Sequence, residues 1–379
     1  MEPTSDNSFN GPRTSRRRLA KLGGVALAGI ALPTGVVAAL NPASASTEES
    51  AGGTALGAAQ SDSPIGYAAQ NGGTTGGYGG ATVNEVTLSE AGGAGALQDL
   101  LDAHQDTPDD GLVVHIDQTI GAGDFEKLDV KDVSNVSLLG VGTSGVFNGV
   151  GINLSWATNI VIRNLTIHHV AEGEGDGIGI QSASSNVWID HNEIYNDYPD
   201  VDKDFYDGLI DVKGESQYIT VSWNYLHDSW KTMLTASSDS EGANGDYITY
   251  ANNFFDNVNS RVPLIRRSHV HFLNNYLLDV VETAVNCRMG AEVLVEGNFF
   301  ENVGDGEADE TTGDIHGPVG WWYGSDEPGF WNLVDNVYEN SPSDHLTSTG
   351  SFTVDYDYTA LTPDEAKAQV SAGAGVGQI

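Results

Sequence analysis

A short phrase recurs along the chain from about residue 160 and restricts the folds that the chain can adopt. Each copy is a run of β-branched or aromatic residues, then an asparagine, then another apolar pair, as in VWIDHNEIY from Val187. The aligned asparagines are Asn164, Asn192, Asn224, Asn253, Asn275, Asn298 and Asn336. Their separations are 28, 32, 29, 22, 23 and 38 residues. The two shortest suit one coil of a parallel β-helix, and the longer ones predict coils that carry loop insertions.

The repeat has a physical reason. A single coil of short strands cannot bury its own apolar face, so stacked coils share one core. An asparagine at the same turn of every coil can bond to its neighbours above and below, which satisfies amides that are costly to bury. A β-sandwich or barrel does not predict an asparagine recurring in phase. We therefore predict an all-β parallel β-helix with structural asparagines, and a helix within EAGGAGALQDLLDAH that caps its open N-terminal end.

The charge balance excludes some partners. The formal net charge is −37, from 53 Asp and Glu against 16 Lys and Arg. Such a surface repels phosphate, so we expect no nucleic-acid partner and no stable membrane association. Hydrophobic residues still make up 39% of the chain, which is enough for a folded core. Evenly spread acidic residues and few lysines favour a halophilic, haloarchaeal type of protein, in which salt screens the self-repulsion.

The N-terminus resembles an export signal. Three arginines, Arg16 to Arg18, precede a Gly/Ala-rich apolar run from Leu22 to Leu40, and the small-residue sequence Ala-Ser-Ala ends at residue 45. This order is typical of a cleaved twin-arginine signal peptide, whereas Pro33 and the diluted hydrophobicity disfavour a membrane anchor. We therefore predict a secreted, extracellular protein with a signal peptide at 1–45, a flexible linker at 46–63 and one domain at 64–379.

Candidate carboxylates occur in pairs. Glu174 and Asp176 lie two residues apart, and Asp207 and Asp211 lie four apart. If these segments are strands, each pair shares one face, and neighbouring coils lie about 4.8 Å apart. Hard oxygen ligands in this arrangement suit calcium. A chain with 53 acidic residues also produces such pairs by chance, so a solvated acidic face is the simpler interpretation of the carboxylates alone.

The scarce basic residues cluster downstream of these carboxylates. Lys231 follows Asp211 by 20 residues, and Arg261 and Arg266 flank Pro263. A lone cation in an acidic chain is ordinarily a surface ion pair that contributes little. Carboxylates that recruit a cation, followed by one lysine and two arginines, instead describe a site for a polyanionic substrate whose carboxylates the basic groups bind.

Several segments resemble the pectate lyase family. They are VWIDHNEI, DGLIDVKGESQYITVSWN, HDSWKTML and RVPLIRRSHVHFLNN, with GYAAQNGGTTGGYGG near the start and VSAGAGVG near the end. The resemblance covers the chain from about Ile65 to Ile379, and the order of its segments makes it specific. It implies a right-handed parallel β-helix that uses calcium to cleave α-1,4-polygalacturonate (pectate) by β-elimination to 4,5-unsaturated oligogalacturonides. We expect the enzyme to be a monomer.

The resemblance also assigns roles to single residues. The implied calcium ligands are Asp176, Asp207, Asp211 and, as a further ligand, Glu174. The implied substrate-binding residues are Lys231 and Arg266, and the implied catalytic base is Arg261, which would take the C5 proton of a uronate. The sequence departs from the family pattern at Ser237, where the family usually has His, and at Arg267 and Ser268, which replace an aromatic–glycine pair.

Three other functions stay open at this point. A pectin lyase acting on methyl-esterified polymer would not need calcium, and the three retained aspartates speak against it. A β-helical polygalacturonase would need paired carboxylic acids and an activated water, but no adjacent Asp-Asp in a glycine setting lies within the coils. A non-catalytic glycan-binding β-helix would be expected to lose a ligand or the base, and every such position is filled.

Overall fold

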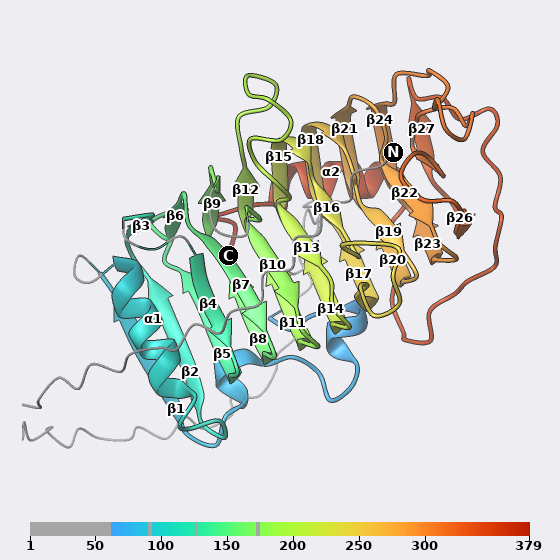
Figure 1. The fold of residues 1–379 in the computed structure, drawn as a ribbon. Helices are drawn as coiled ribbons and strands as arrows, with labels where there is room; N and C mark the ends of the chain where they lie inside the picture. Colours follow the sequence, from blue (N-terminus) through green and yellow to red (C-terminus); the bar gives the residue numbers. More distant parts are fainter. Residues whose placement is uncertain (1–61, 90–92, 124, 126, 172–174) are drawn as a thin grey trace, which may run out of the picture. The chain divides into compact units, whose positions relative to one another are not determined.

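The computed structural model describes residues 62–379 apart from 90–92, 124, 126 and 172–174. In this part of the chain, successive short strands form three parallel sheets, and each coil visits the three sheets in the same order (Figure 1). The architecture is the predicted right-handed parallel β-helix. Because each strand pairs with the equivalent strand of the next coil, residues far apart in the sequence are placed side by side.

The three sheets differ in length. Sheet 1 has ten strands: β1 (Val83–Leu88), β2 (Gly111–Ile116), β5 (Ser134–Gly140), β8 (Thr158–Arg163), β11 (Ser185–Asp190), β14 (Gln217–Ser222), β17 (Asp246–Ala251), β20 (His269–Leu273), β23 (Glu292–Glu296) and β26 (Phe330–Val334). Sheet 2 has nine: β3 (Thr119–Gly121), β6 (Val146–Asn148), β9 (Thr166–His168), β12 (Glu193–Tyr195), β15 (Tyr225–Lys231), β18 (Phe254–Ser260), β21 (Tyr276–Val280), β24 (Phe299–Val303) and β27 (Val337–Glu339). Sheet 3 has eight: β4 (Lys127–Lys131), β7 (Gly151–Ser155), β10 (Ile178–Gln181), β13 (Ile210–Val212), β16 (Met233–Leu234), β19 (Leu264–Arg266), β22 (Val285–Arg288) and β25 (Val319–Gly320).

The core is a set of apolar rows that run through the stack. Ile162, Ile189 and Val221 lie opposite one another in register on β8, β11 and β14, and all three are fully buried. β-Branched side chains pack well on such pleated surfaces. No single coil could shield these rows, so the core exists only because successive coils stack in register.

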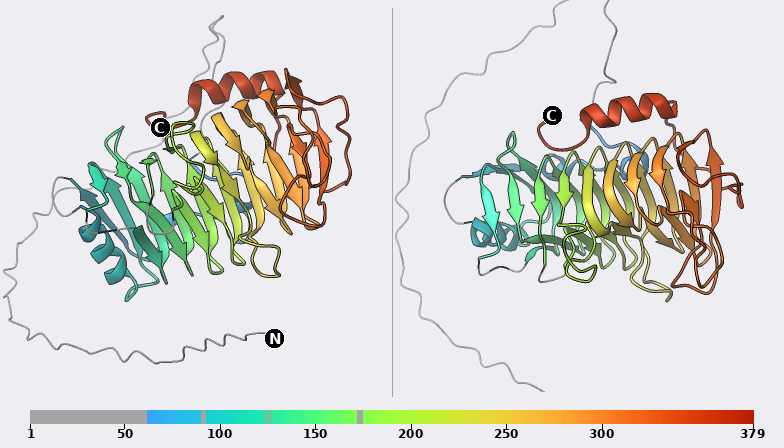
Figure 2. Two further views of the ribbon diagram at one scale, coloured as in Figure 1. Left: turned by 45° about the horizontal axis from the view of Figure 1, so that its top comes forward. Right: turned by 90° about the horizontal axis from the view of Figure 1, so that it is seen from above.

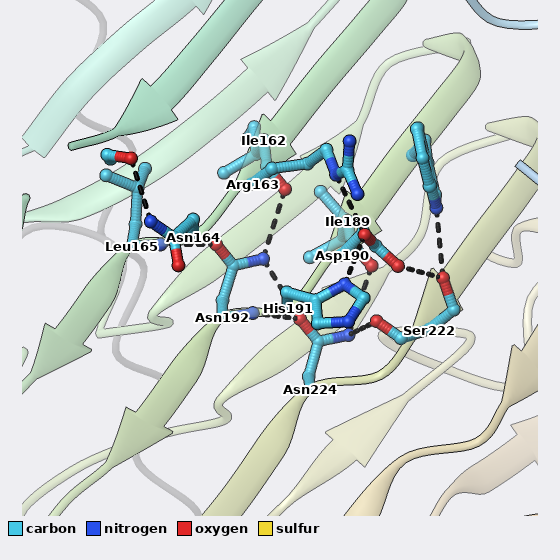
Figure 3. A network of polar contacts seen from close by, with 12 residues as sticks. Ile162, Arg163, Asn164, Leu165, Ile189, Asp190, His191, Asn192, Ser222 and Asn224 are labelled. Atoms are coloured by element: carbon cyan, nitrogen blue, oxygen red, sulfur yellow. Dashed lines mark hydrogen bonds and ion pairs between the residues drawn. The ribbon is translucent and has the colours of Figure 1, made fainter. Parts of the chain in front are cut away.

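The predicted asparagine ladder runs through the turn between sheets 1 and 2 (Figure 3). The backbone N–H and the side-chain amide of Asn192 both donate to Oδ1 of Asn224, each at 2.9 Å. The same two bonds link the following members in order: Asn224, Asn253, Asn275, Asn298 and Asn336. The amide of Asn224 also donates to the carbonyl of Ile189 at 3.0 Å, so its polar atoms are satisfied inside the stack.

The predicted ladder is wrong by one residue at its first member, Asn164. Leu165 occupies the ladder position in its coil, and its N–H donates to Oδ1 of Asn192 at 3.0 Å. Asn164 lies at the preceding turn position and donates to the carbonyls of Gly140 and Gly142. That position is left-handed in coil after coil, with φ between 48° and 66° at Asn164, His191, Trp223, Asn252, Asn274, Gly297 and Asp335. Asparagine tolerates this conformation, which is why Asn164 imitates a ladder residue in the sequence.

The VWIDH segment forms a buried polar network next to the ladder (Figure 3). The Asp190 carboxylate lies 2.8 Å from Nε of Arg163 and 2.6 Å from Nδ1 of His191, and it accepts a 2.6 Å hydrogen bond from Oγ of Ser222. The Arg163 guanidinium also stacks over the ring of Trp188, 4.3 Å from its centroid. These contacts join β8, β11 and β14, and His191 is buried, so the segment stabilises coil stacking.

Two helices pack on the stack. In α1 (Gly93–His104), Leu97 and Leu101 are buried against the core, and Gln98 bonds to the backbone of Asp129. A helix is therefore present where the sequence predicts one, although its role as a cap stays a prediction. Figure 2 shows α2 (Pro363–Gly373) lying along the flank of the stack, where it contacts β21 and β24.

The N-terminal predictions fall largely outside the described residues. The predicted signal peptide at 1–45 lies wholly outside them, and so does the predicted linker except for its last two residues. Within the described ranges, no helix has the length and apolar character needed to cross a membrane. The helices η1 (Gly66–Ala69) and η2 (Gly76–Gly79) begin the described chain and lie against sheet 1.

We predict that Asn253→Ala destabilises the fold by about 3–5 kcal/mol, because it leaves several buried donors of the ladder unpaired. Asn253 is fully buried and bonds to Asn224, Asn275 and the carbonyl of Val221. Asn336→Ala is the matched control, since that residue ends the ladder and is only partly buried. Thermal unfolding should show a larger fall in Tm for Asn253→Ala, and equal falls would contradict the proposed role of the ladder.

Candidate active site

The described candidate residues gather at sheet 3 and the turns that enter it. They are Asp176 in the turn before β10, Asp207 before β13, Asp211 in β13, Lys231 at the end of β15, Arg261 between β18 and β19, and Arg266 at the end of β19. Glu174 lies outside the described residues. The strand spacing expected for the carboxylates is wrong for Asp176 and Asp207, which lie in turns, and Arg261 also lies in a turn. They meet through stacking of the coils and not through alternation along one strand.

Asp176 and Asp211 form a buried carboxylate pair. Both side chains are almost inaccessible, and Nζ of Lys213 lies 2.9 Å from Oδ2 of Asp176 and 3.9 Å from Oδ2 of Asp211. Burial raises the pKa of Asp176, and burial together with the Asp176 charge raises the pKa of Asp211 well above its usual value. One lysine therefore faces two buried carboxylates, and this pocket has a deficit of positive charge.

Gly208 allows the two carboxylates to approach each other. A Cβ atom at this position would lie 2.4 Å from Oδ1 of Asp211 and 3.3 Å from Oδ1 of Asp176. The N–H of Gly208 also donates to Oδ1 of Asp176 at 3.2 Å. Any side chain at position 208 would therefore fill the space that both oxygens face.

The pair has the chemistry of a calcium site, although a full ligand set is not assembled. Among the residues that the structure describes, no three His, Cys, Asp or Glu side chains come close enough to hold a metal ion. Oδ1 of Asp207 lies 3.6 Å from Nζ of Lys231, and its side chain is half exposed. The hard oxygens of Asp176 and Asp211 and their uncompensated charge fit a calcium ion, and Asp207 lies close enough to affect the pKa of both.

Lys231 and Arg261 line one pocket beside this pair. The pocket has a volume of about 160 Å³ and is also lined by Glu282 and Tyr323. Nζ of Lys231 lies 2.9 Å from Oδ1 of the exposed Asp204. Arg261 has φ of 60° and is partly exposed. Because the turns of this fold repeat left-handed residues, that conformation alone is no sign of function.

Arg266 is held more firmly than Arg261. Its Nε lies 2.6 Å from Oδ1 of Asp239, and its Nη1 donates to the carbonyl of Ala236 at 3.0 Å. Burial lowers the pKa of Arg266, the Asp239 charge opposes this, and Arg261 adds to it. Arg267 is exposed and its Nε donates to the carbonyl of Asp239, so of these two neighbours only Arg266 faces the site.

Two basic residues of the site were missed in the sequence. Lys213 follows Asp211 by two residues in DVK and shares its face. Arg288 lies opposite Arg266 in the next coil, is 1% exposed, and stacks over Tyr323 at 5.0 Å. Burial, and then the charge of Arg266, lowers the pKa of Arg288 to about 10. The separation of 22 residues from Arg266 to Arg288 equals the length of one coil, which is the signal that could have found it.

The loop before β26 contributes one aromatic residue, Tyr323, to the pocket. Trp322 is fully buried and its Nε1 donates to the carbonyl of Ile315, so it packs at the end of the coil. Tyr323 is the residue of this loop that reaches the pocket, with its hydroxyl 3.0 Å from Oγ1 of Thr283.

A parallel β-helix that carries buried carboxylates beside a cationic pocket has the features of a protein that acts on acidic polysaccharides. The family model for pectate lyase matches residues 51–379. The chain is 45% identical over 317 residues to the pectate trisaccharide-lyase of Bacillus licheniformis, covering 83% of this chain and 86% of that protein. It is 39% identical over 317 residues to pectate lyase A of Emericella nidulans, with the same coverage of both chains.

A solved structure agrees with these sequence matches. The pectate lyase of Bacillus sp. N165, crystallised with trigalacturonate, superposes with a TM-score of 0.80 and 48% identity, covering 83% of this chain and 99% of that one. The chain therefore belongs to the pectate lyase family, as its sequence motifs indicate, and it is a polysaccharide lyase. These relatives are bacterial and fungal, so a haloarchaeal origin stays a prediction.

We predict that Asp211→Asn changes stability in two ways: it weakens the pH dependence of stability in chelator, and it removes the stabilisation by added calcium. Because the pKa of Asp211 is raised in the native state, the native chain binds more protons than the unfolded chain above about pH 4, and its stability falls as pH rises through that window. Asn keeps the shape and removes the charge. When Tm is measured in chelator from acid to neutral pH, it should fall less with rising pH for the variant than for the wild type.

The same variant has a second readout at neutral pH. Added calcium should raise the Tm of the wild type and leave the Asp211→Asn variant unchanged. Asp132→Asn, an exposed site beyond the end of β4, is the control and should behave as the wild type does. A calcium-induced shift of wild-type size in Asp211→Asn would contradict this ligand assignment.

Proposed function

We propose that the protein is a calcium-dependent pectate lyase that cleaves α-1,4-polygalacturonate by β-elimination and releases 4,5-unsaturated oligogalacturonides. The observation that carries the proposal is the placement of Lys231 and Arg261 in one pocket beside the buried pair Asp176 and Asp211. In a chain of net charge −37, a pocket with converging cations is suited to an acidic polymer. The trigalacturonate bound by the Bacillus relative supports the same class of substrate.

The carboxylates supply the calcium site in this proposal. Asp176 and Asp211 would hold the ion, Asp207 would join them by turning from Lys231, and Glu174 would serve as a further ligand. When bound, calcium would neutralise the uronate carboxylate and so acidify the neighbouring C5 proton. Nζ of Lys213 lies within 4 Å of an oxygen of each buried carboxylate and offsets part of their charge.

The basic residues bind substrate and move the proton. Lys231 and Arg266 bind uronate carboxylates, and Lys231 stabilises the negative charge that develops as the C5 proton leaves. Arg261 takes that proton, the C5–H electrons form the C4–C5 double bond, and the C4–O bond breaks. The departing glycosidic oxygen takes a proton from water.

A guanidinium base is unusual, because the group ordinarily keeps its proton. In this proposal, the demand on the base is reduced at the substrate. Calcium and Lys231 would withdraw charge from the uronate carboxylate, and the C5 proton that Arg261 takes would be more acidic for that reason.

The cellular setting follows from the sequence and the family. We infer that the protein is a secreted monomer, exported by the twin-arginine route with a signal at 1–45, a linker at 46–63 and a catalytic domain at 64–379. The acidic composition supports a halophilic protein without nucleic-acid or stable membrane partners. The burial of Leu97 and Leu101 supports α1 as the cap of the N-terminal end of the stack.

We predict that Arg261→Ala lowers kcat on polygalacturonate by about 10²–10⁴-fold, the usual loss when a general base is removed. The rate is followed by the near-ultraviolet absorbance of the unsaturated product, with added calcium and with chelator. Arg267→Ala is the matched control, because it removes an exposed guanidinium six residues away and should keep wild-type activity.

Other outcomes would point to the rival functions. Full activity in Arg261→Ala would remove that residue from the base role. A chelator-resistant product on methylated pectin alone would indicate a pectin lyase. Binding without any turnover by the wild type would indicate a glycan-binding protein.

A further inference from the structure

A second groove lies at the turns that follow β7, β10, β13 and β16 of sheet 3, next to the carboxylate pair. It has a volume of about 480 Å³ and is lined by Trp156, Gln181, Ser182, Lys213, Glu215 and Ser237, among others. Lys213 belongs to both places, since its Nζ contacts Asp176 and its side chain lines the groove. The groove is therefore joined to the carboxylate pair through Lys213 and reaches Trp156 beside β7.

Trp156 is the unusual residue in this groove. The chain has seven tryptophans, and Trp156 is the only exposed one, at 56% of its surface. It directly follows β7 with φ of 50°, and its N–H donates to the carbonyl of Ser182 in the next coil at 3.2 Å. The backbone therefore fixes a large aromatic ring in solvent at the edge of the groove, where it stabilises no core.

The two sides of Trp156 carry different groups. Nζ of Lys131, at the end of β4, lies over its ring at 5.4 Å from the centroid. Gln181, Lys213 and the other groove residues come from β10, β13 and β16 and the turns that follow these strands. Because β4 and β10 pair with opposite edges of β7 (Figure 1), Lys131 approaches from one side and the groove opens on the other.

The spacing suits a sugar chain that runs across the strands. Asp211 is in register with Asn153, two strands away in the order β7, β10, β13, and Trp156 lies three residues beyond Asn153. Two strand spacings and three residues along the strand place Trp156 roughly 14 Å from Asp211. An indole offers a flat apolar surface to the face of a pyranose ring. Lys131 and Lys213 offer positive charge to uronate carboxylates on either side, and Glu215 is the acidic group among those that line the groove.

We propose that Trp156 and this groove form a distal uronate-binding subsite, in which a galacturonate ring stacks on the indole and its carboxylate faces Lys213 or Lys131. The inference rests on the proposed function for the substrate class and adds a subsite to it. It predicts that the enzyme binds long oligogalacturonides more tightly than short ones, because only long chains reach from the carboxylate pair to Trp156. Ser237, where the sequence departs from the family pattern, lines this groove and leaves it open.

The test compares Trp156→Ala with the conservative variant Trp156→Phe and the control Tyr78→Ala. Tyr78 is similarly exposed, at 54%, but lies in η2 beside sheet 1. KM and kcat are measured on polygalacturonate and on the shortest oligogalacturonide that the wild type cleaves. For Trp156→Ala we expect a rise in KM of about five- to tenfold on the polymer, with kcat and the short substrate within about twofold of wild type. Trp156→Phe should recover most of the loss.

An unchanged KM on the polymer in Trp156→Ala would overturn the subsite. So would an equal rise on the short substrate, since that would indicate a general disturbance of the fold. The subsite would also be overturned if Tyr78→Ala raised KM on the polymer by a similar factor.

A binding measurement separates this proposal from the proposed function. Calorimetric titration of hexagalacturonate into the Arg261→Ala variant, with and without Trp156→Ala, reports affinity without turnover. If the wild type forms no unsaturated product but Trp156→Ala still weakens this binding, the subsite stands and the lyase proposal fails. If the wild type is an active lyase and Trp156→Ala changes neither affinity nor KM, the lyase proposal stands and the subsite fails.

Discussion

The register between successive coils is the constraint on which the rest of the structure depends. Parallel pairing places equivalent residues of each coil in line, and the asparagine ladder holds that line by two bonds per step. The same register brings Asp176 and Asp211 together from neighbouring coils and sets Arg288 opposite Arg266. The core and the candidate site are therefore consequences of one repeat, and a disturbed ladder should affect both.

Electrostatics then separates this site from the remainder of the surface. The chain carries a net charge of −37, yet the charge of Arg261 reaches Arg266, Arg288 and the buried Asp211, and Lys231 lines the same pocket as Arg261. Burial makes Asp176 and Asp211 costly to ionise. A cation that binds the carboxylates relieves that cost, and an acidic polymer that binds the arginines offsets their mutual repulsion. If the proposed function holds, the site takes both a cation and an acidic polymer, and its affinities for calcium and for substrate should be linked.

Much of this could be predicted from the sequence, because a repeat records the register directly. The ladder from Asn192 to Asn336 follows from the spacing alone. The prediction that Asn164 belongs to the ladder was wrong, because its left-handed turn position also favours asparagine. The placement of Asp176, Asp207 and Arg261 in turns could not be inferred, since a sequence does not show where each short strand begins. Lys213, Arg288 and Trp156 were missed because their surroundings come from other coils, although the 22-residue step from Arg266 would have indicated Arg288.

The central claim is that calcium-dependent elimination occurs at the cationic pocket, and the masses of the products test it most directly. Polygalacturonate is digested with calcium and with chelator, and the oligomers are examined by mass spectrometry. The account predicts products with an unsaturated non-reducing end, one water lighter than the hydrolysis products, formed only with calcium. Saturated products would show hydrolysis, and unsaturated products that persist in chelator would show that Asp176 and Asp211 do not act through a bound ion.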